Sequence, residues 1–72
     1  MTDVQRAVML QSVLEFLQHN AGTPFAVADI AERLECSPGL AETTLEALAE
    51  AGQIERLQQI HRPVTYVVNK YL

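Results

Sequence analysis

Two helix-boundary signals, at residues 37–38 and at residue 52, constrain the fold of this chain more than any other feature. Serine is a favoured N-cap, and proline fits the first position of a helix because the N–H that it lacks would have no partner there; these residues are Ser37 and Pro38. Gly52 favours the left-handed conformation that ends a helix. We therefore predict a helix from Pro38 to about Ala51. Three apolar residues are expected on its inner face: Ala41, Leu45 and Leu48.

Two further helices are predicted before this one. Apolar residues recur every three or four positions between Asp3 and Asn20, which indicates an amphipathic helix that Gly22 and Pro24 end. This apolar stripe comprises Val4, Ala7, Leu10, Val13, Leu14 and Leu17. A second helix is predicted from Val27 to Glu35, and Cys36 and Ser37 form the turn that follows. Its inward residues are expected to be Ile30, Ala31 and Leu34.

The remaining segments predict strands. Phe25 and Ala26 are expected to form a very short extended segment, and a strand is predicted from Ile54 to Ile60. Val64 to Asn69 is rich in β-branched and aromatic residues, which favour strands. The three residues between them, His61-Arg62-Pro63, are expected at the tip of a hairpin. The predicted fold class is therefore α+β, in the order helix, strand, helix, helix, strand, strand.

Length and composition restrict the classes of function. The chain has 72 residues, so we expect a single domain over 1–72. It has one cysteine, Cys36, which excludes an intrachain disulfide and is expected to act as a small buried apolar residue. We find no catalytic set and no motif for a metal or cofactor, so an enzyme is not expected. No apolar run approaches the length of a membrane helix and no signal peptide is evident, so we expect a cytoplasmic protein.

The predicted pair of helices, their turn and the glycine stop resemble the winged helix-turn-helix superfamily, which includes many small bacterial transcription regulators. The residues that carry the resemblance are Asp29-Ile30-Ala31-Glu32-Arg33-Leu34, Cys36-Ser37-Pro38, Leu45, Leu48 and Ala51-Gly52-Gln53-Ile54-Glu55-Arg56. The resemblance implies three helices with a C-terminal β-hairpin wing, and a third helix that enters the DNA major groove. It implies these DNA-contacting positions: Ser37, Gly39, Leu40, Thr43, Thr44 and Ala47 near the third helix, and Arg56, His61 and Arg62 on the wing.

The charge of the third helix departs from that family. No Lys or Arg occurs between Arg33 and Arg56, whereas Glu42, Glu46 and Glu50 follow one another at four-residue spacing. The whole chain has 5 Lys and Arg against 9 Asp and Glu, a net charge of −4. Such a row is commonly a solvated helix face; alternatively it avoids nucleic acid or attracts a basic partner, because carboxylates repel phosphates. Arg56 is expected to be an exposed strand residue that pairs with Glu55 or Glu50.

Two hypotheses of function follow. The first is a regulator that binds double-stranded DNA as a homodimer, so that dimerisation doubles the weak site at His61 and Arg62. The second is a winged-helix protein-interaction module that has lost DNA binding. The first helix is the expected dimer interface, through Met9, Val13 and Phe16, with Tyr71 near the C-terminus as a contributor.

Overall fold

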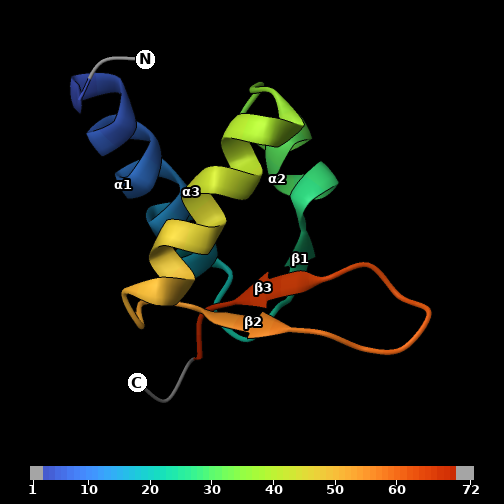
Figure 1. Ribbon diagram of the computed structural model, residues 1–72. Helices are drawn as coiled ribbons and strands as arrows, with labels where there is room; N and C mark the ends of the chain where they lie inside the picture. Colours follow the sequence, from blue (N-terminus) through green and yellow to red (C-terminus); the bar gives the residue numbers. More distant parts are fainter. Residues whose placement is uncertain (1–2, 70–72) are drawn as a thin grey trace.

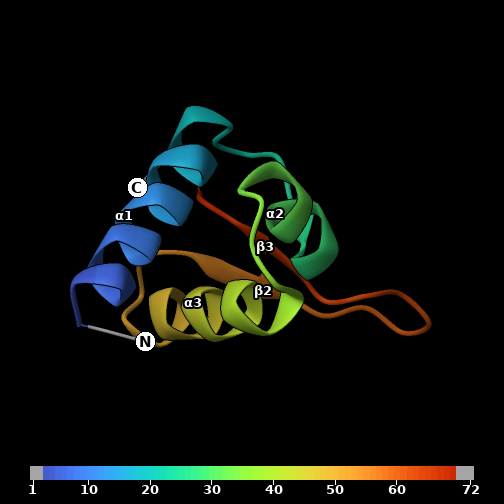
Figure 2. The ribbon, with the colours of Figure 1, turned by 90° about the horizontal axis from the view of Figure 1, so that it is seen from above.

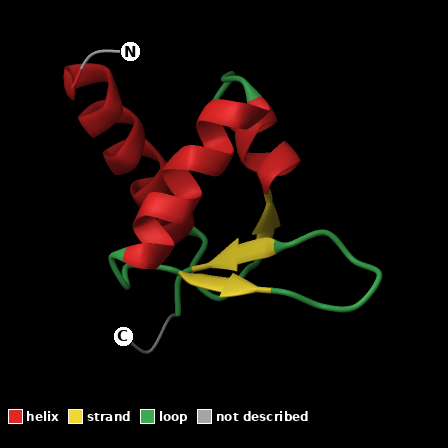
Figure 3. Ribbon diagram, in the orientation of Figure 1, coloured by secondary structure: helices red, strands yellow, loops and turns green. Residues whose placement is uncertain are grey.

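The computed structural model describes residues 3–69 of the chain (Figure 1). Its elements are α1 (Asp3–His19), β1 (Phe25–Ala26), α2 (Val27–Arg33), α3 (Pro38–Glu50), β2 (Glu55–Leu57) and β3 (Thr65–Val67). This is an α+β arrangement in the element order expected from the sequence (Figure 3). The three helices pack together, and the strands lie at one end of them (Figure 1).

The sheet is antiparallel in the order β1-β3-β2, so the last strand in the sequence lies in the middle. Tyr66 on β3 pairs with Phe25 on one side and with Arg56 on the other. The sheet thereby ties the segment after α1 to the segment after α3. Both strands of the hairpin are shorter than expected, because β2 and β3 pair over only three residues each before the chain opens into a loop over 58–64.

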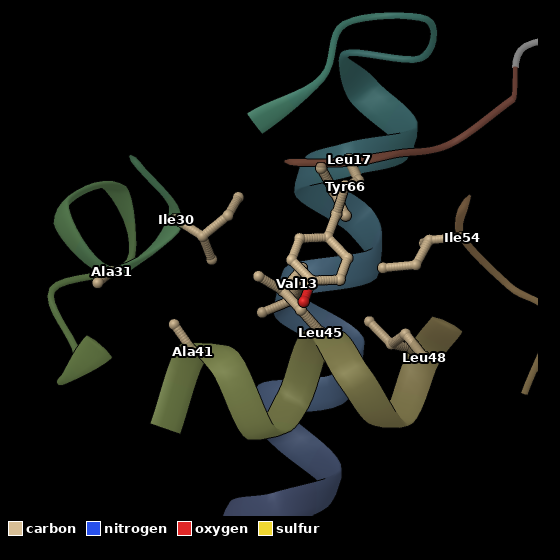
Figure 4. Close-up of a cluster of buried hydrophobic side chains, with 9 residues drawn as sticks. All are labelled: Val13, Leu17, Ile30, Ala31, Ala41, Leu45, Leu48, Ile54 and Tyr66. Atoms are coloured by element: carbon tan, nitrogen blue, oxygen red, sulfur yellow. The ribbon is translucent and has the colours of Figure 1, made fainter. Parts of the chain in front are cut away.

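The hydrophobic core lies where the three helices meet the sheet (Figure 4). Its largest fully buried side chains come from all three helices and the central strand: Tyr66, Leu17, Ile30, Leu45 and Val13. Burying a side chain of this size contributes about 1.5–3 kcal/mol relative to exposure. The expected inner face of α3 is confirmed, because Ala41, Leu45 and Leu48 all belong to this core.

The helix boundaries follow from local hydrogen bonds. Ser37 caps α3 as expected, since its Oγ accepts a hydrogen bond from the N–H of Leu40 at 3.2 Å. Gly52 after α3 has φ 76°, the left-handed conformation that glycine adopts without strain. The second helix ends at Arg33, two residues before the expected end, because Glu35 adopts φ 54° and the N–H of Cys36 donates to the Ala31 carbonyl at 3.0 Å.

Only the C-terminal part of the apolar stripe of α1 is buried in the core. Leu17 is fully buried, whereas Val4 is 73% exposed and Val8 57% exposed. The expectation that Val4 and Ala7 would face inward with the rest of the stripe is therefore wrong. The reason is that the first turns of α1 extend beyond the body formed by α2, α3 and the sheet (Figures 1 and 2). The periodicity identifies the apolar face of a helix, but not how far its partner elements reach.

Candidate functional site

The outer surface of α3 carries a row of small side chains one turn apart. Gly39, Thr43 and Ala47 are all exposed, and we call them the α3 strip. The hydroxyl of Thr43 donates to the Gly39 carbonyl at 2.9 Å, so this donor is already used within the helix. A Cβ built on Gly39 would meet no atom within 4 Å, so the space above this position is open. The α3 strip therefore allows another molecule to approach the helix backbone closely.

Thr44 does not belong to this surface, and its expected outward position is wrong. Its side chain is 5% exposed, and its hydroxyl donates to the Leu40 carbonyl at 2.8 Å. The physical reason is that α1 packs against this side of α3 and covers Thr44. Leu40 is half-buried and lies beside the first turns of α1. Ser37 is exposed at the start of α3, as expected.

Glu46 is half-buried and contacts the sheet, whereas Glu42 and Glu50 are exposed. Its carboxylate accepts a hydrogen bond from the hydroxyl of Tyr66 at 2.5 Å, and Nε of Arg56 lies 3.3 Å from the same oxygen. Burial raises the pKa of the Tyr66 hydroxyl above its usual range, and the hydrogen bond to Glu46 raises it further. Glu46, Tyr66 and Arg56 form a polar cluster that joins α3 to β2 and β3.

This polar cluster was not predicted from the sequence. The expected partners of Arg56 were Glu55 and Glu50, but the structure pairs it with Glu46. The missing information is the register of the sheet, which places Arg56 directly beside Tyr66 and brings both under α3. A tyrosine in an otherwise aliphatic strand is a weak signal of such a contact, because a buried tyrosine hydroxyl usually finds a hydrogen-bond partner.

The loop between β2 and β3 carries the two other charged or titratable residues expected at the site. His61 and Arg62 are exposed at its far end, as expected for a hairpin tip. His61 adopts φ 63°, and the N–H of Arg62 donates to the Gln59 carbonyl at 3.3 Å, which closes the turn. The loop projects away from the helices (Figures 1 and 2). Its residues are therefore accessible to a large partner.

The residues expected at a dimer interface on α1 are mostly part of the core. Val13 is completely buried, so its assignment to an exposed interface is wrong. Phe16 is half-buried, with its ring centroid 5.0 Å from that of Phe25, and Met9 is half-buried against the core. The broad apolar arc of α1 serves the core at its C-terminal half. Tyr71 lies outside the described residues.

A shallow apolar groove occupies the other end of α1. It runs between the first turns of α1 and the start of α3, and it is lined by Val4, Gln5, Val8, Met9 and Leu40. Within residues 3–69, no group of three or more His, Cys, Asp or Glu side chains is placed to hold a metal ion. Cys36 is half-buried and packs against the core.

Comparison with known proteins does not identify a family for this chain. No protein-family model matches the sequence, and no curated protein matches it significantly. Among the helices of residues 3–69, none is long and apolar enough to cross a membrane.

Proposed function

We propose that this chain is a winged helix-turn-helix protein that binds double-stranded DNA as a transcription regulator. In this proposal α2 and α3 are the helix-turn-helix, the loop between β2 and β3 is the wing, and α3 enters the major groove. The observation that carries the proposal is the α3 strip. Because Gly39, Thr43 and Ala47 are small and exposed, the helix can approach base edges and thymine methyl groups closely.

The polar cluster weakens the main objection to DNA binding. Three carboxylates in a row beside a phosphate backbone would oppose association. The central one, Glu46, faces the sheet and is paired with Arg56, so its charge is largely compensated within the molecule. Glu42 and Glu50 remain exposed. We therefore expect weak affinity for arbitrary DNA and a strong dependence on the wing residues His61 and Arg62.

The proposal is tested by adding one carboxylate to the α3 strip. Association of the protein with a labelled DNA duplex is measured by fluorescence anisotropy over a series of salt concentrations. Thr43→Glu should reduce the association constant about fivefold, because a new charge about 4 Å from a phosphate costs about 1 kcal/mol in bulk water. Gln18→Glu, an equal change at an exposed position of α1, is the control and should have little effect.

Two results would contradict DNA binding. One is a wild-type protein that shows no salt-dependent binding at low ionic strength. The other is equal loss of binding in Thr43→Glu and Gln18→Glu, since the effect would then come from net charge and not from the α3 strip. Circular dichroism of both variants establishes that they fold equally well.

A second candidate function, a protein-interaction module, is favoured by the apolar groove. Val4 and Val8 are large apolar residues that are mostly exposed, and they lie beside Leu40. A photo-reactive residue at Gln5, on the edge of the groove, would cross-link a protein partner in the native host. The module hypothesis predicts one specific product that Val8→Glu abolishes, together with an absence of DNA binding by the wild-type protein.

A further inference from the structure

A small hollow lies between α1 and α3, on the side of the α3 strip that faces away from the sheet. It has a volume of about 140 Å³ and is lined by Arg6, Leu10, Thr43, Thr44 and Ala47. Two of these residues, Thr43 and Ala47, belong to the α3 strip itself. The hollow therefore places the side chain of an α1 residue, Arg6, next to the surface that the proposed function assigns to DNA.

Arg6 is the positively charged residue among those that line this hollow, and within the described part of the molecule no carboxylate pairs with it. The side chain is exposed, and among residues 3–69 it forms no ion pair. No carboxylate lines the hollow. The hydroxyls of Thr43 and Thr44 already donate to main-chain carbonyls. The guanidinium of Arg6 is thus the group at this position that can donate hydrogen bonds to an anion.

The position of Arg6 complements that of the hairpin. Successive residues of a helix are about 100° apart around its axis, so Glu46 and Ala47 point to different sides of α3. The Glu46 side contacts Arg56 on β2, and the Ala47 side borders Arg6 on α1. The α3 strip therefore lies between the hairpin on one flank and Arg6 on the other.

We propose that Arg6 binds a phosphodiester of the DNA backbone on the side of the major groove opposite the hairpin. This inference rests on the proposed function. A helix in the major groove has a phosphate strand on each side, because the groove is about 12 Å wide. Arginine suits this contact, since its planar fork of N–H donors matches phosphate oxygens. The site contributes orientation and affinity, and Arg6 is a phosphate-contacting residue that does not select the sequence.

The test compares three substitutions of exposed arginines on the full chain. The probe is a fluorescein-labelled duplex of about 24 base pairs with random sequence, titrated over about 25–150 mM NaCl, where counterion release governs affinity. Arg6→Gln should lower the association constant about eightfold at about 0.1 M salt, and it should reduce the slope of log K against log salt by about 0.9. Arg6→Lys should restore the slope, because lysine keeps the charge.

Arg33→Gln is the matched control. Arg33 is exposed at the end of α2 and does not line the hollow, yet its substitution changes the net charge equally. We expect it to alter the association constant by less than about twofold, since screened charges away from the interface contribute little. Equal effects of Arg6→Gln and Arg33→Gln, or an unchanged slope in Arg6→Gln, would overturn the assignment of Arg6.

The outcomes separate this inference from the function on which it rests. If Thr43→Glu weakens binding more than Gln18→Glu does but Arg6→Gln leaves the affinity and slope unchanged, the DNA-binding proposal stands and the phosphate contact of Arg6 is refuted. If the wild-type protein shows no salt-dependent binding, both are refuted. A reduced slope in Arg6→Gln with restoration in Arg6→Lys supports both.

Discussion

At the residue scale, Glu46 accepts a hydrogen bond from Tyr66 and pairs with Arg56, and the two contacts differ in strength. The side chains of Arg56 and Glu46 are 45% and 42% exposed, so solvent screens the ion pair, which contributes at most about 1 kcal/mol. The Tyr66 side chain is buried, and its hydroxyl would lose its partner if Glu46 moved. We infer that the hydrogen bond, more than the ion pair, holds α3 against the sheet.

Removing the Tyr66 hydroxyl tests this ranking. Tyr66→Phe should lower the free energy of unfolding by about 1 kcal/mol, because the hydrogen bond is lost while the ring remains packed. Arg56→Gln should lower it by less than that. Urea denaturation of both variants measures the difference. A larger loss in Arg56→Gln than in Tyr66→Phe would show that the ion pair dominates.

The raised pKa of Tyr66 predicts a dependence of stability on alkaline pH. Its ordinary value is 10.0, and burial followed by the hydrogen bond to Glu46 raises it in the folded protein. A raised pKa means that the folded state binds the proton more tightly, so this contribution to stability is full below pH 10 and is lost as pH rises through the folded value. Wild-type protein should therefore lose stability more steeply than Tyr66→Phe above pH 10. Parallel losses in the two proteins would contradict the prediction.

At the element scale, local signals predicted the helices well and the contacts between elements poorly. The cap at Ser37 and the stop at Gly52 involve only neighbouring residues, and both are confirmed. Thr44 and Val13 were misplaced because their exposure depends on how α1 and α3 pack. Periodicity gives the centre of an apolar face, whereas its edges are decided by the neighbouring helix.

The same limit applies to the candidate site. The exposed positions of Gly39, Thr43, Ala47 and Arg62 agree with those expected from the sequence. The pairing of Glu46 with Tyr66 spans 20 residues and depends on the register of the sheet. No local pattern encodes such a contact. The sequence therefore does not show that Glu46 is paired with the sheet while Glu42 and Glu50 are exposed.

The exposed start of α1 changes the prediction for self-association. A Phe16 substitution would not test a dimer interface, since this ring packs against Phe25 and its loss would disturb the core. We predict that the protein sediments as a dimer and that Val4→Glu with Val8→Glu sediments as a monomer, because both valines are mostly exposed. The measurement is sedimentation velocity at several protein concentrations.

The matched control for this experiment is Gln18→Glu with Ala28→Glu, which adds the same charge at exposed positions elsewhere. The control should remain a dimer. If Val4→Glu with Val8→Glu remains a dimer as well, α1 is not the interface. A wild-type protein that is a monomer at every concentration would refute self-association altogether.

At the scale of the whole molecule, the proposed DNA binding depends on how a small number of cations are placed on a chain of net charge −4. Arg56 is engaged with Glu46, whereas Arg62 lies on the projecting loop and Arg6 beside the α3 strip. One copy therefore offers few cations to phosphates, so we expect a low affinity and a shallow dependence on salt, because each contact releases about one counterion. A dimer would double this number.

The most direct test of the account is a residue-by-residue map of the surface that contacts DNA. Amide chemical shifts of the labelled protein are recorded during titration with a DNA duplex at low salt. We predict that the shifts centre on the α3 strip at Gly39, Thr43 and Ala47, and on the loop at His61 and Arg62. Shifts confined to the groove at Val4 and Val8, or no shifts at any concentration of duplex, would contradict the proposal that α3 and the hairpin bind DNA.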